Sequence, residues 1–228
     1  MVKTAIDLTE RFNATLAYHQ SDEISLFFLE QKHSKIPATH IYSGRVQKIV
    51  SVIASYAAAR FNHHLTLFDW LDLCPKVAQR MLGFTAHFDG RVVPCDSNNR
   101  AMECIFWRSN FDGLRNAISH ISHHHSTRDQ LHGISVIKQL ELLEKRQVDV
   151  YKTFSDQILY GTWIKREQFE LENAVNPKTG LPVKDKVLRS RFRSGSFNWA
   201  GYTVEQREQF LTAKFWNNVQ DPPPMHDL

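Results

Sequence analysis

The chain has 228 residues, 42% of them hydrophobic and 23% charged, and it carries a formal net charge of +4 with a pI near 9.0. This composition is typical of a globular protein and argues against extensive disorder. No run of about 18 apolar residues occurs, and the three cysteines lack paired metal spacing. The sequence therefore predicts a cytoplasmic protein without a membrane span, disulfides or structural zinc, and its modest positive charge favours an anionic partner.

The amino-terminal part predicts a helix, a β-hairpin and a second, longer helix. Apolar residues recur at helical spacing at the start of the chain and again from Val46, at positions i, i+3, i+4 and i+7. Between them, two β-rich runs flank a polar stretch, and the second run is almost wholly apolar, which is typical of a strand covered by helices. The predicted elements are a helix over 4–13, strands over 15–18 and 24–29, a loop over 31–44 and a helix from residue 46 to about 57.

The rest of the chain predicts mainly helices. Asp89-Gly90 is a turn signal for a hairpin, and Asp112-Gly113 indicates a break between two helices. The predicted elements are helices over 65–81, 99–107, 114–125, 134–143 and 204–216, a hairpin over 84–93 and a strand over 160–164. This order favours an α+β fold. Turn-rich composition after Glu172 places a boundary there, between a domain over 1–172 and a basic extension over 173–228 that frays after residue 220.

Two adjacent carboxylates, Asp22 and Glu23, lie at the predicted hairpin tip beside the apolar strand. Acids in such a setting are costly to desolvate unless a cation compensates them, so they are candidate Mg²⁺ ligands for phosphoryl transfer. Adjacent residues on a strand point to opposite faces, which favours Asp22 as the ligand and Glu23 in a supporting or second-metal role. The alternative is that the Ser-Asp-Glu segment is ordinary polar loop sequence.

Basic residues gather at two places. Arg45 and Lys48 are three residues apart on a helix face that is separate from the apolar stripe, which suits a clamp for phosphates. A concentrated positive segment follows Lys178, and we predict that it contacts an RNA backbone unless it is only a solvated surface hairpin. Its candidate RNA-binding residues are Lys184, Lys186, Arg189, Arg191 and Arg193.

Three ordered segments resemble one known family. Residues 18–25, Tyr-His-Gln-Ser-Asp-Glu-Ile-Ser, are similar to the Tyr-Gly-Gln-Ser-Asp-Glu-Tyr/Ile-Ser segment of the tRNA(His) guanylyltransferase family, the reverse polymerases that extend a tRNA at its 5′ end. Residues 88–93, Phe-Asp-Gly-Arg-Val-Val, then Ser97-Asn98 and Trp107-Arg108, resemble family segments in the same order. The similarity covers roughly residues 1 to 166 and is closest to the short Thg1-like repair members.

The resemblance implies a polymerase-palm-like, ferredoxin-like core and a nucleotidyltransferase that takes a tRNA and ATP or GTP as substrates. It implies that Asp22 bridges two Mg²⁺ ions, that Ser21 contacts the nucleotide, and that Glu23 is an acid needed for activity. It also implies that Arg45 and Lys48 lie close to the triphosphate, and that the protein is a tetramer.

The chain departs from the family at two places. The family's Arg-Leu-Asp-Gly-Arg strand, which supplies the other metal-binding Asp, is absent, so a tRNA-binding module without catalysis is the alternative hypothesis. The family's His-Ile-Asn-Asn-Leu-Tyr-Asn motif is replaced over residues 113–119, which begin with Gly113, and this puts strict tRNA(His) specificity in question. Two further hypotheses are weaker: a palm-type nucleotide cyclase, and a helical zinc pair of His120 and His124, which fits a polar helix face better.

Overall fold

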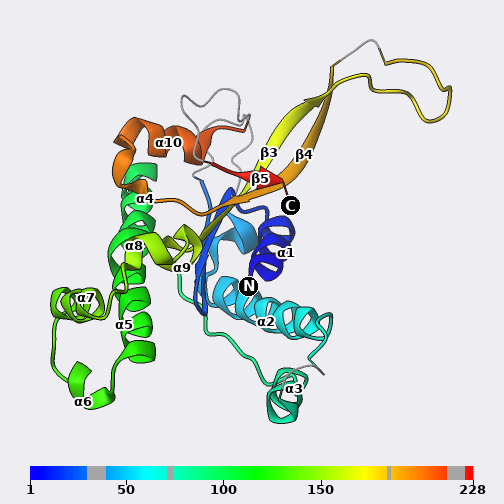
Figure 1. Ribbon diagram of the computed structural model, residues 1–228. Coiled ribbons are helices and arrows are strands. Elements are labelled where there is room, and N and C mark those ends of the chain that lie inside the picture. The colour runs from blue at the N-terminus through cyan, green and yellow to red at the C-terminus, as the bar shows by residue number, and fades with distance from the viewer. Residues whose placement is uncertain (30–39, 71–73, 184–185, 215–223, 228) are drawn as a thin grey trace.

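The computed structural model describes residues 1–29, 40–70, 74–183, 186–214 and 224–227. Within them the chain forms an antiparallel sheet in the order β2-β1-β3-β4-β5, with helices on both faces (Figure 1). The strands are β1 (Leu16–Gln20), β2 (Glu23–Phe27), β3 (Thr162–Leu171), β4 (Val187–Gly195) and β5 (His226–Asp227). The predicted α+β class is confirmed.

One face of the sheet is covered by α1 (Val2–Phe12) and α2 (Val46–Leu65), as Figure 1 shows. The apolar stripe of α1 buries Ala5 against Ala17 of β1 and Ile164 of β3, and all three residues are fully inaccessible to solvent. The helical spacing predicted from the sequence is therefore the spacing of the residues that dock on the sheet.

The opposite face packs against α4 (Asn98–Trp107) and α10 (Val204–Thr212). Trp163 neighbours Ile164 on β3, and because successive strand side chains point to opposite faces, it lies in this second core. Its ring makes edge-on contacts with Trp199 at 5.3 Å and Phe210 at 6.1 Å between centroids. Residues that are far apart in the sequence therefore form one aromatic core on the sheet face opposite α1 and α2.

A helical lobe extends from the far end of α4. A π-helical segment, η2 (Arg108–Gly113), joins α4 directly to α5, so the two form one long column in Figure 1. The lobe has its own apolar cluster, which includes Ile118, Leu143 and Leu159. Its helices are α5 (Leu114–His125), α6 (Arg128–Leu131), α7 (Val136–Lys145), α8 (Val150–Thr153) and α9 (Asp156–Tyr160); the remaining short helices of the described chain are η1 (Ile41–Gly44), α3 (Pro75–Met81) and η3 (Trp199–Gly201).

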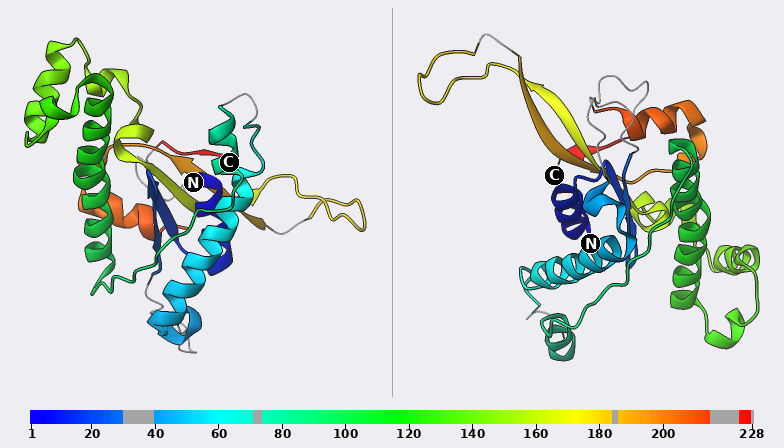
Figure 2. Two further views of the ribbon diagram at one scale, coloured as in Figure 1. Left: turned by 90° about the horizontal axis from the view of Figure 1, so that it is seen from below. Right: turned by 180° about the vertical axis from the view of Figure 1, so that it is seen from behind.

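Strands β3 and β4 run past the rest of the sheet and form an arm that protrudes from the body in every view (Figures 1 and 2). The predicted extension over 173–228 therefore reaches the sheet through β4 and the second core through Phe210. Its division from residues 1–172 as a separate domain stays a prediction, and the predicted frayed tail lies largely outside the described residues. No helix in the described ranges has the length and apolar character needed to cross a membrane.

Three predicted elements differ from the structure. The helix predicted over 65–81 is wrong, because α2 ends at Leu65 and α3 begins only at Pro75. The hairpin over 84–93 is also wrong, since these residues form no strand and pair with no strand of the described chain. The predicted break at Asp112-Gly113 is instead the π-helical segment, in which the chain continues as a helix with a wider turn.

Candidate functional site

The tip of the β1–β2 hairpin is a two-residue turn made of Ser21 and Asp22. Gln20 and Glu23 are the last paired residues of the two strands, and Ser21 adopts a left-handed conformation with φ 53°. Ser21, Asp22 and Glu23 are all exposed. A positive φ at a residue other than glycine is uncommon, and such strain often lies at functional sites.

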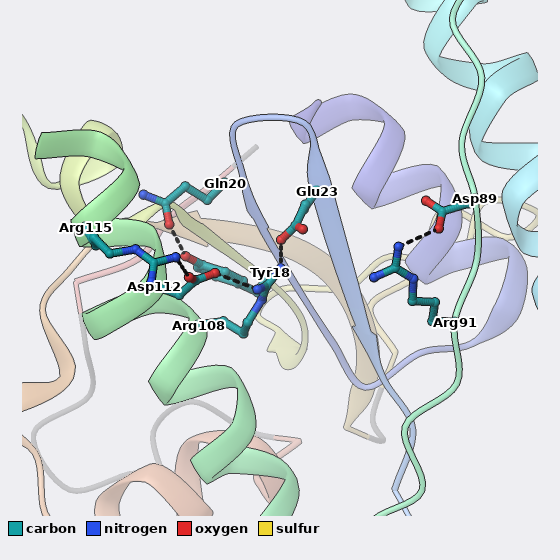
Figure 3. Close-up of polar contacts among 8 residues, drawn as sticks. All are labelled: Tyr18, Gln20, Glu23, Asp89, Arg91, Arg108, Asp112 and Arg115. Atoms are coloured by element: carbon teal, nitrogen blue, oxygen red, sulfur yellow. Dashed lines mark hydrogen bonds and ion pairs between the residues drawn. The ribbon is translucent and has the colours of Figure 1, made fainter. Parts of the chain in front are cut away.

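The two carboxylates at this tip have different surroundings. Asp22 makes no hydrogen bond or ion pair with any described residue, whereas Glu23 forms an ion pair with Arg108. Figure 3 shows the Glu23 side chain directed toward Arg108. Asp22 is therefore available to bind a cation from solution, whereas Glu23 is already paired with the guanidinium of Arg108.

Arg108 continues this ion pair into a short network. Its Nη1 donates to Asp112 Oδ2 at 2.6 Å, and Arg115 pairs with the other carboxylate oxygen of Asp112 (Figure 3). The Asp112 side chain is only 10% exposed, so a largely buried carboxylate holds both arginines. The π-helical turn places Arg108 and Asp112 within reach of the hairpin, and π-helical turns often occur at functional sites.

The base of the hairpin is anchored by Gln20. Tyr18 donates its hydroxyl to Gln20 Oε1 at 2.7 Å, and Gln20 Nε2 donates to the carbonyl oxygen of Leu159 at 3.1 Å. Burial raises the pKa of Tyr18 to about 12, so the phenol remains a donor at neutral pH. Gly113 faces this amide, and a Cβ at Gly113 would overlap the Gln20 side chain. The glycine at this position thus makes room for the Gln20 side chain.

The amino terminus of α2 forms a second charged region. Arg45 and Lys48 line a shallow groove of about 580 Å³ together with Ser51. Tyr42 and Ser43 just before it have positive φ values, Lys48 Nζ lies 4.9 Å from the Tyr42 ring centroid, and no side chain caps the helix. The first amides of an uncapped helix and two cationic side chains suit an anion. Neither cation pairs with Asp22 in the described structure.

Residues 88–93 lie on the other side of the hairpin from Arg108. Asp89 and Arg91 form an exposed ion pair of 3.0 Å with each other, and Figure 3 shows them apart from the network around Arg108. The side chains of Asp89 and Arg91 therefore make no described contact with the turn at Ser21 and Asp22.

The predicted RNA-binding residues divide into paired and open ones. Arg191 and Arg193 lie 3.0 and 3.5 Å from Glu167, whose side chain is 4% exposed, and both also pair with Asp227. Lys186 pairs with Glu170 in an exposed contact of 2.8 Å. Arg189 is exposed and pairs with no described carboxylate, and Lys184 lies outside the described residues.

The contact that the sequence did not predict is the one between Glu23 and Arg108. The Trp107-Arg108 segment was noted for its family resemblance, but nothing local connects Arg108 with a residue 85 positions earlier. The contacts of Gln20 and Asp112 were not predicted either, because they depend on the packing of the helical lobe against the hairpin.

The described residues contain no group of three or more His, Cys, Asp or Glu side chains placed to hold a metal ion. Mg²⁺ is commonly bound by one or two carboxylates, with nucleotide phosphates and waters completing its shell. Asp22, an exposed carboxylate without a protein partner, fits an ion of that kind. Glu23 fits it only if Arg108 releases the carboxylate.

Residues 1–96 match the sequence model of the Thg1 family, described as tRNAHis guanylyltransferase. A protein of Acanthamoeba polyphaga mimivirus, named Uncharacterized protein R259, is 32% identical over 205 residues, which are 85% of this chain and 66% of the viral protein. The chain thus spans just under two thirds of the length of this relative.

Two solved structures of a bacterial tRNA(HIS) guanylyltransferase (Thg1)-like protein share the fold. The structure in complex with ATP has a TM-score of 0.58 at 24% identity and covers 73% of this chain and 65% of that one. The structure in complex with GTP has a TM-score of 0.58 at 20% identity and covers 93% of this chain and 76% of that one. The resemblance seen in the motifs is therefore confirmed over residues 1–96, which match the Thg1 family of tRNAHis guanylyltransferases.

Proposed function

We propose that this protein is a tRNA 5′-end nucleotidyltransferase that adds GTP, or a templated nucleotide, in the reverse, 3′–5′ direction. A 5′-phosphate oxygen of the tRNA bonds to the α-phosphorus of ATP or GTP, and pyrophosphate leaves. The 3′-hydroxyl oxygen of the incoming nucleotide then bonds to the activated 5′ phosphorus, the nucleoside monophosphate leaves, and the hydroxyl proton goes to solvent. The observation that carries this proposal is Asp22, an exposed carboxylate without a described partner inside the segment that matches the family model.

Asp22 would hold Mg²⁺, with Glu23 as a second ligand where Arg108 releases it. When bound, the ion would neutralise phosphate charge and polarise a phosphoryl oxygen. Ser21, whose left-handed backbone forms the turn, directs Asp22 away from the hairpin and toward solvent. The protein's own contribution is therefore an exposed carboxylate at the tip of the hairpin.

The groove at the start of α2 would receive the triphosphate. Arg45 and Lys48 supply positive charge, and the first amides of an uncapped helix donate to phosphate oxygens. The ATP and GTP of the two bacterial complexes support a nucleotide as the ligand of this family fold.

Arg108 would position Glu23. Its guanidinium contacts both Glu23 and Asp112, so it fixes the direction of the Glu23 carboxylate and balances its charge. In this arrangement the ion pair of Glu23 with Arg108 holds the end of β2 next to Asp22.

The outer part of the β3–β4 arm would contact the RNA backbone. Arg189 has no described acidic partner, and the exposed pair of Lys186 with Glu170 is weak enough to exchange for a phosphate. Phe169 lies opposite Arg189 in the strand register, on the same face, and its ring centroid is 4.9 Å from the Arg191 guanidinium. Arg191 and Arg193 are instead held at the base of the arm by Glu167.

The proposal is tested by nucleotide addition to a 5′-monophosphorylated tRNA that lacks its first nucleotide. We expect the full chain to add a nucleotide when Mg²⁺ is present, and Asp22→Asn to lower the rate at least about a hundredfold, because metal-assisted charge stabilisation is worth several kcal/mol. The matched control is Asp129→Asn, an exposed first-turn acid of α6 outside the site, which should leave the rate unchanged.

Equal rates for the wild type and Asp22→Asn would contradict the proposed role of Asp22. If the wild type binds tRNA in a salt-dependent manner but incorporates no nucleotide, the alternative of a tRNA-binding module replaces the enzyme. A cyclic product formed from NTP without RNA would indicate a nucleotide cyclase.

A further inference from the structure

An acidic side chain of β5 lies among the arginines of β4. Arg189, Arg191 and Arg193 alternate along β4, so they share one face of the sheet, and Asp227 shares it too because it is paired with Arg193 in the strand register. Asp227 Oδ2 lies 3.1 Å from Arg191 Nη1, and Asp227 Oδ1 lies 3.5 Å from Arg193 Nε. One carboxylate thus bridges two guanidinium groups at the base of the β3–β4 arm.

The two acids that hold Arg191 differ in burial. Glu167 accepts a hydrogen bond from Arg191 Nε at 3.0 Å and is 4% exposed, whereas Asp227 accepts from Nη1 and is 65% exposed. Glu167 lies within the long pairing of β3 with β4, but β5 is a two-residue strand at the edge of the sheet (Figure 1). Breaking a buried ion pair is costly, and breaking an exposed one is not. Asp227 is therefore the partner that can leave Arg191 while Glu167 stays.

We propose that Asp227 occupies the place of an RNA phosphate on β4 and that bound tRNA displaces it from Arg191. This inference rests on the proposed function, in which the arm contacts a tRNA. Carboxylates and phosphates are bound by the same fork of arginine N–H donors, so one can replace the other. The Nη1 group would turn from Asp227 to a phosphate oxygen, and Nε would keep its bond to Glu167.

The surroundings of Arg191 suit such an exchange. Its side chain is 37% exposed, against 19% for Arg193, so it is the more accessible of the two bridged arginines. The Phe169 ring centroid lies 4.9 Å from the Arg191 guanidinium, and this contact does not depend on Asp227. Phe169 and Glu167 can therefore hold the guanidinium in place when Asp227 leaves.

A chain of phosphates fits this face better than a single anion. Arg189, which is exposed, lies two residues from Arg191 on the same face, or about 6–7 Å along the strand. A free anion must compete with a carboxylate that belongs to the same molecule and has a high effective concentration. A polyanion that already contacts Arg189 presents its next phosphate at a high local concentration as well. The expected partner is thus an RNA backbone and not inorganic phosphate.

The experiment measures the binding of a 5′-monophosphorylated tRNA to the full chain by fluorescence anisotropy. Salt is held constant, because the affinity depends on it, and Mg²⁺ and nucleotide are left out. Asp227→Asn keeps the shape of the side chain and removes its charge. We expect this variant to bind tRNA about two- to fivefold more tightly, the range set by the strength of an exposed ion pair, and circular dichroism should show an unchanged fold.

Two controls separate displacement from a general change in charge. Glu172→Gln removes one exposed acid from the same arm that is not among the described partners of Arg191, and it should strengthen binding less. In an Arg191→Gln background, Asp227→Asn should give no gain, because the arginine that it frees is gone. If Arg191→Gln does not fold, Arg191→Lys replaces it, since lysine can pair with Glu167 but lacks the forked donors.

The inference is overturned if Glu172→Gln strengthens binding as much as Asp227→Asn, if the gain survives in the Arg191 variant, or if the chain binds no tRNA. Nucleotide addition is assayed separately. Tighter binding by Asp227→Asn without any nucleotide addition would contradict the proposed function alone. Addition by the wild type together with unchanged tRNA binding by Asp227→Asn would contradict the displacement of Asp227 alone.

Discussion

The hairpin turn and the β3–β4 arm each carry a cluster of like charges, but they use those charges differently. At the turn, one acid of two is paired: Glu23 is held by Arg108, while Asp22 has no described partner. On the arm, Arg191 and Arg193 are held by a nearly buried carboxylate, and Arg189 further out is not. In both regions the internally paired charges stabilise the fold, and those without a partner among the described residues are ones that we propose to bind a ligand.

The base of the arm should show the largest effect on stability. Glu167→Gln removes the charge that Arg191 and Arg193 share in a nearly buried setting, and we expect a loss of about 3 kcal/mol or more in the free energy of unfolding. Urea unfolding monitored by circular dichroism measures it. Glu170→Gln, which breaks the exposed pair with Lys186, is the matched control and should change stability little. If Glu167→Gln and Glu170→Gln lower the free energy of unfolding equally, burial does not distinguish the two ion pairs.

Lys165 should make the stability of the same region depend on pH. Its side chain is buried, and Nζ contacts the carbonyl oxygens of Phe210 and Leu211 at the end of α10. Burial lowers its pKa to about 7, an effect that nearby Glu167 partly offsets. Because the unfolded chain holds this proton up to a pKa of about 10.4, the unfolded state binds more protons between these values, and stability rises with pH there by at most ~1.4 kcal/mol per unit.

Unfolding experiments between pH 7 and 10 measure this slope, which Lys165→Met should flatten. An unchanged slope in the variant would show that another group titrates.

At the turn, Gly113→Ala should displace Gln20 and loosen the hairpin. The new Cβ would overlap the Gln20 amide, so the hydrogen bonds to Tyr18 and Leu159 would be lost at a cost of about 1–3 kcal/mol. In a Gln20→Ala background the same substitution should cost less, because the overlapping side chain is gone. Additive effects of the two substitutions would argue against this direct contact.

The smallest effect is expected from the outer part of the arm. Arg189→Ala should weaken tRNA binding modestly and lower the slope of log affinity against log salt by roughly one contact, about 0.7–0.9. Arg166→Ala is the control, because its register position lies on the opposite face of the same arm. Equal salt slopes for the wild type and Arg189→Ala would remove Arg189 from the proposed RNA surface.

Local sequence patterns predicted those elements whose cause is local. The apolar spacing of Ala5, Leu8 and Phe12 identified α1, and the two β-rich runs around the polar tip identified the hairpin. The same reasoning failed at residues 84–93, where Val92 and Val93 favour a strand but no described edge pairs with them.

The polar contacts of the candidate site depend on packing between distant segments. The sequence marked Asp22 and Glu23 alike, and only the fold shows that Arg108 reaches Glu23 and leaves Asp22 open. On the arm, the buried carboxylate of Glu167 separates two structural arginines from the exposed Arg189, although all lie in one basic run.

The most direct test of the central claim is the Mg²⁺ dependence of nucleotide binding at Asp22. Calorimetric titration of the full chain with ATP or GTP, with and without Mg²⁺, compares the wild type with Asp22→Asn. We predict that Mg²⁺ strengthens binding to the wild type and that Asp22→Asn loses most of this gain, while Asp129→Asn retains it. An identical gain in the wild type and Asp22→Asn would contradict the assignment of Asp22 as the metal-holding carboxylate.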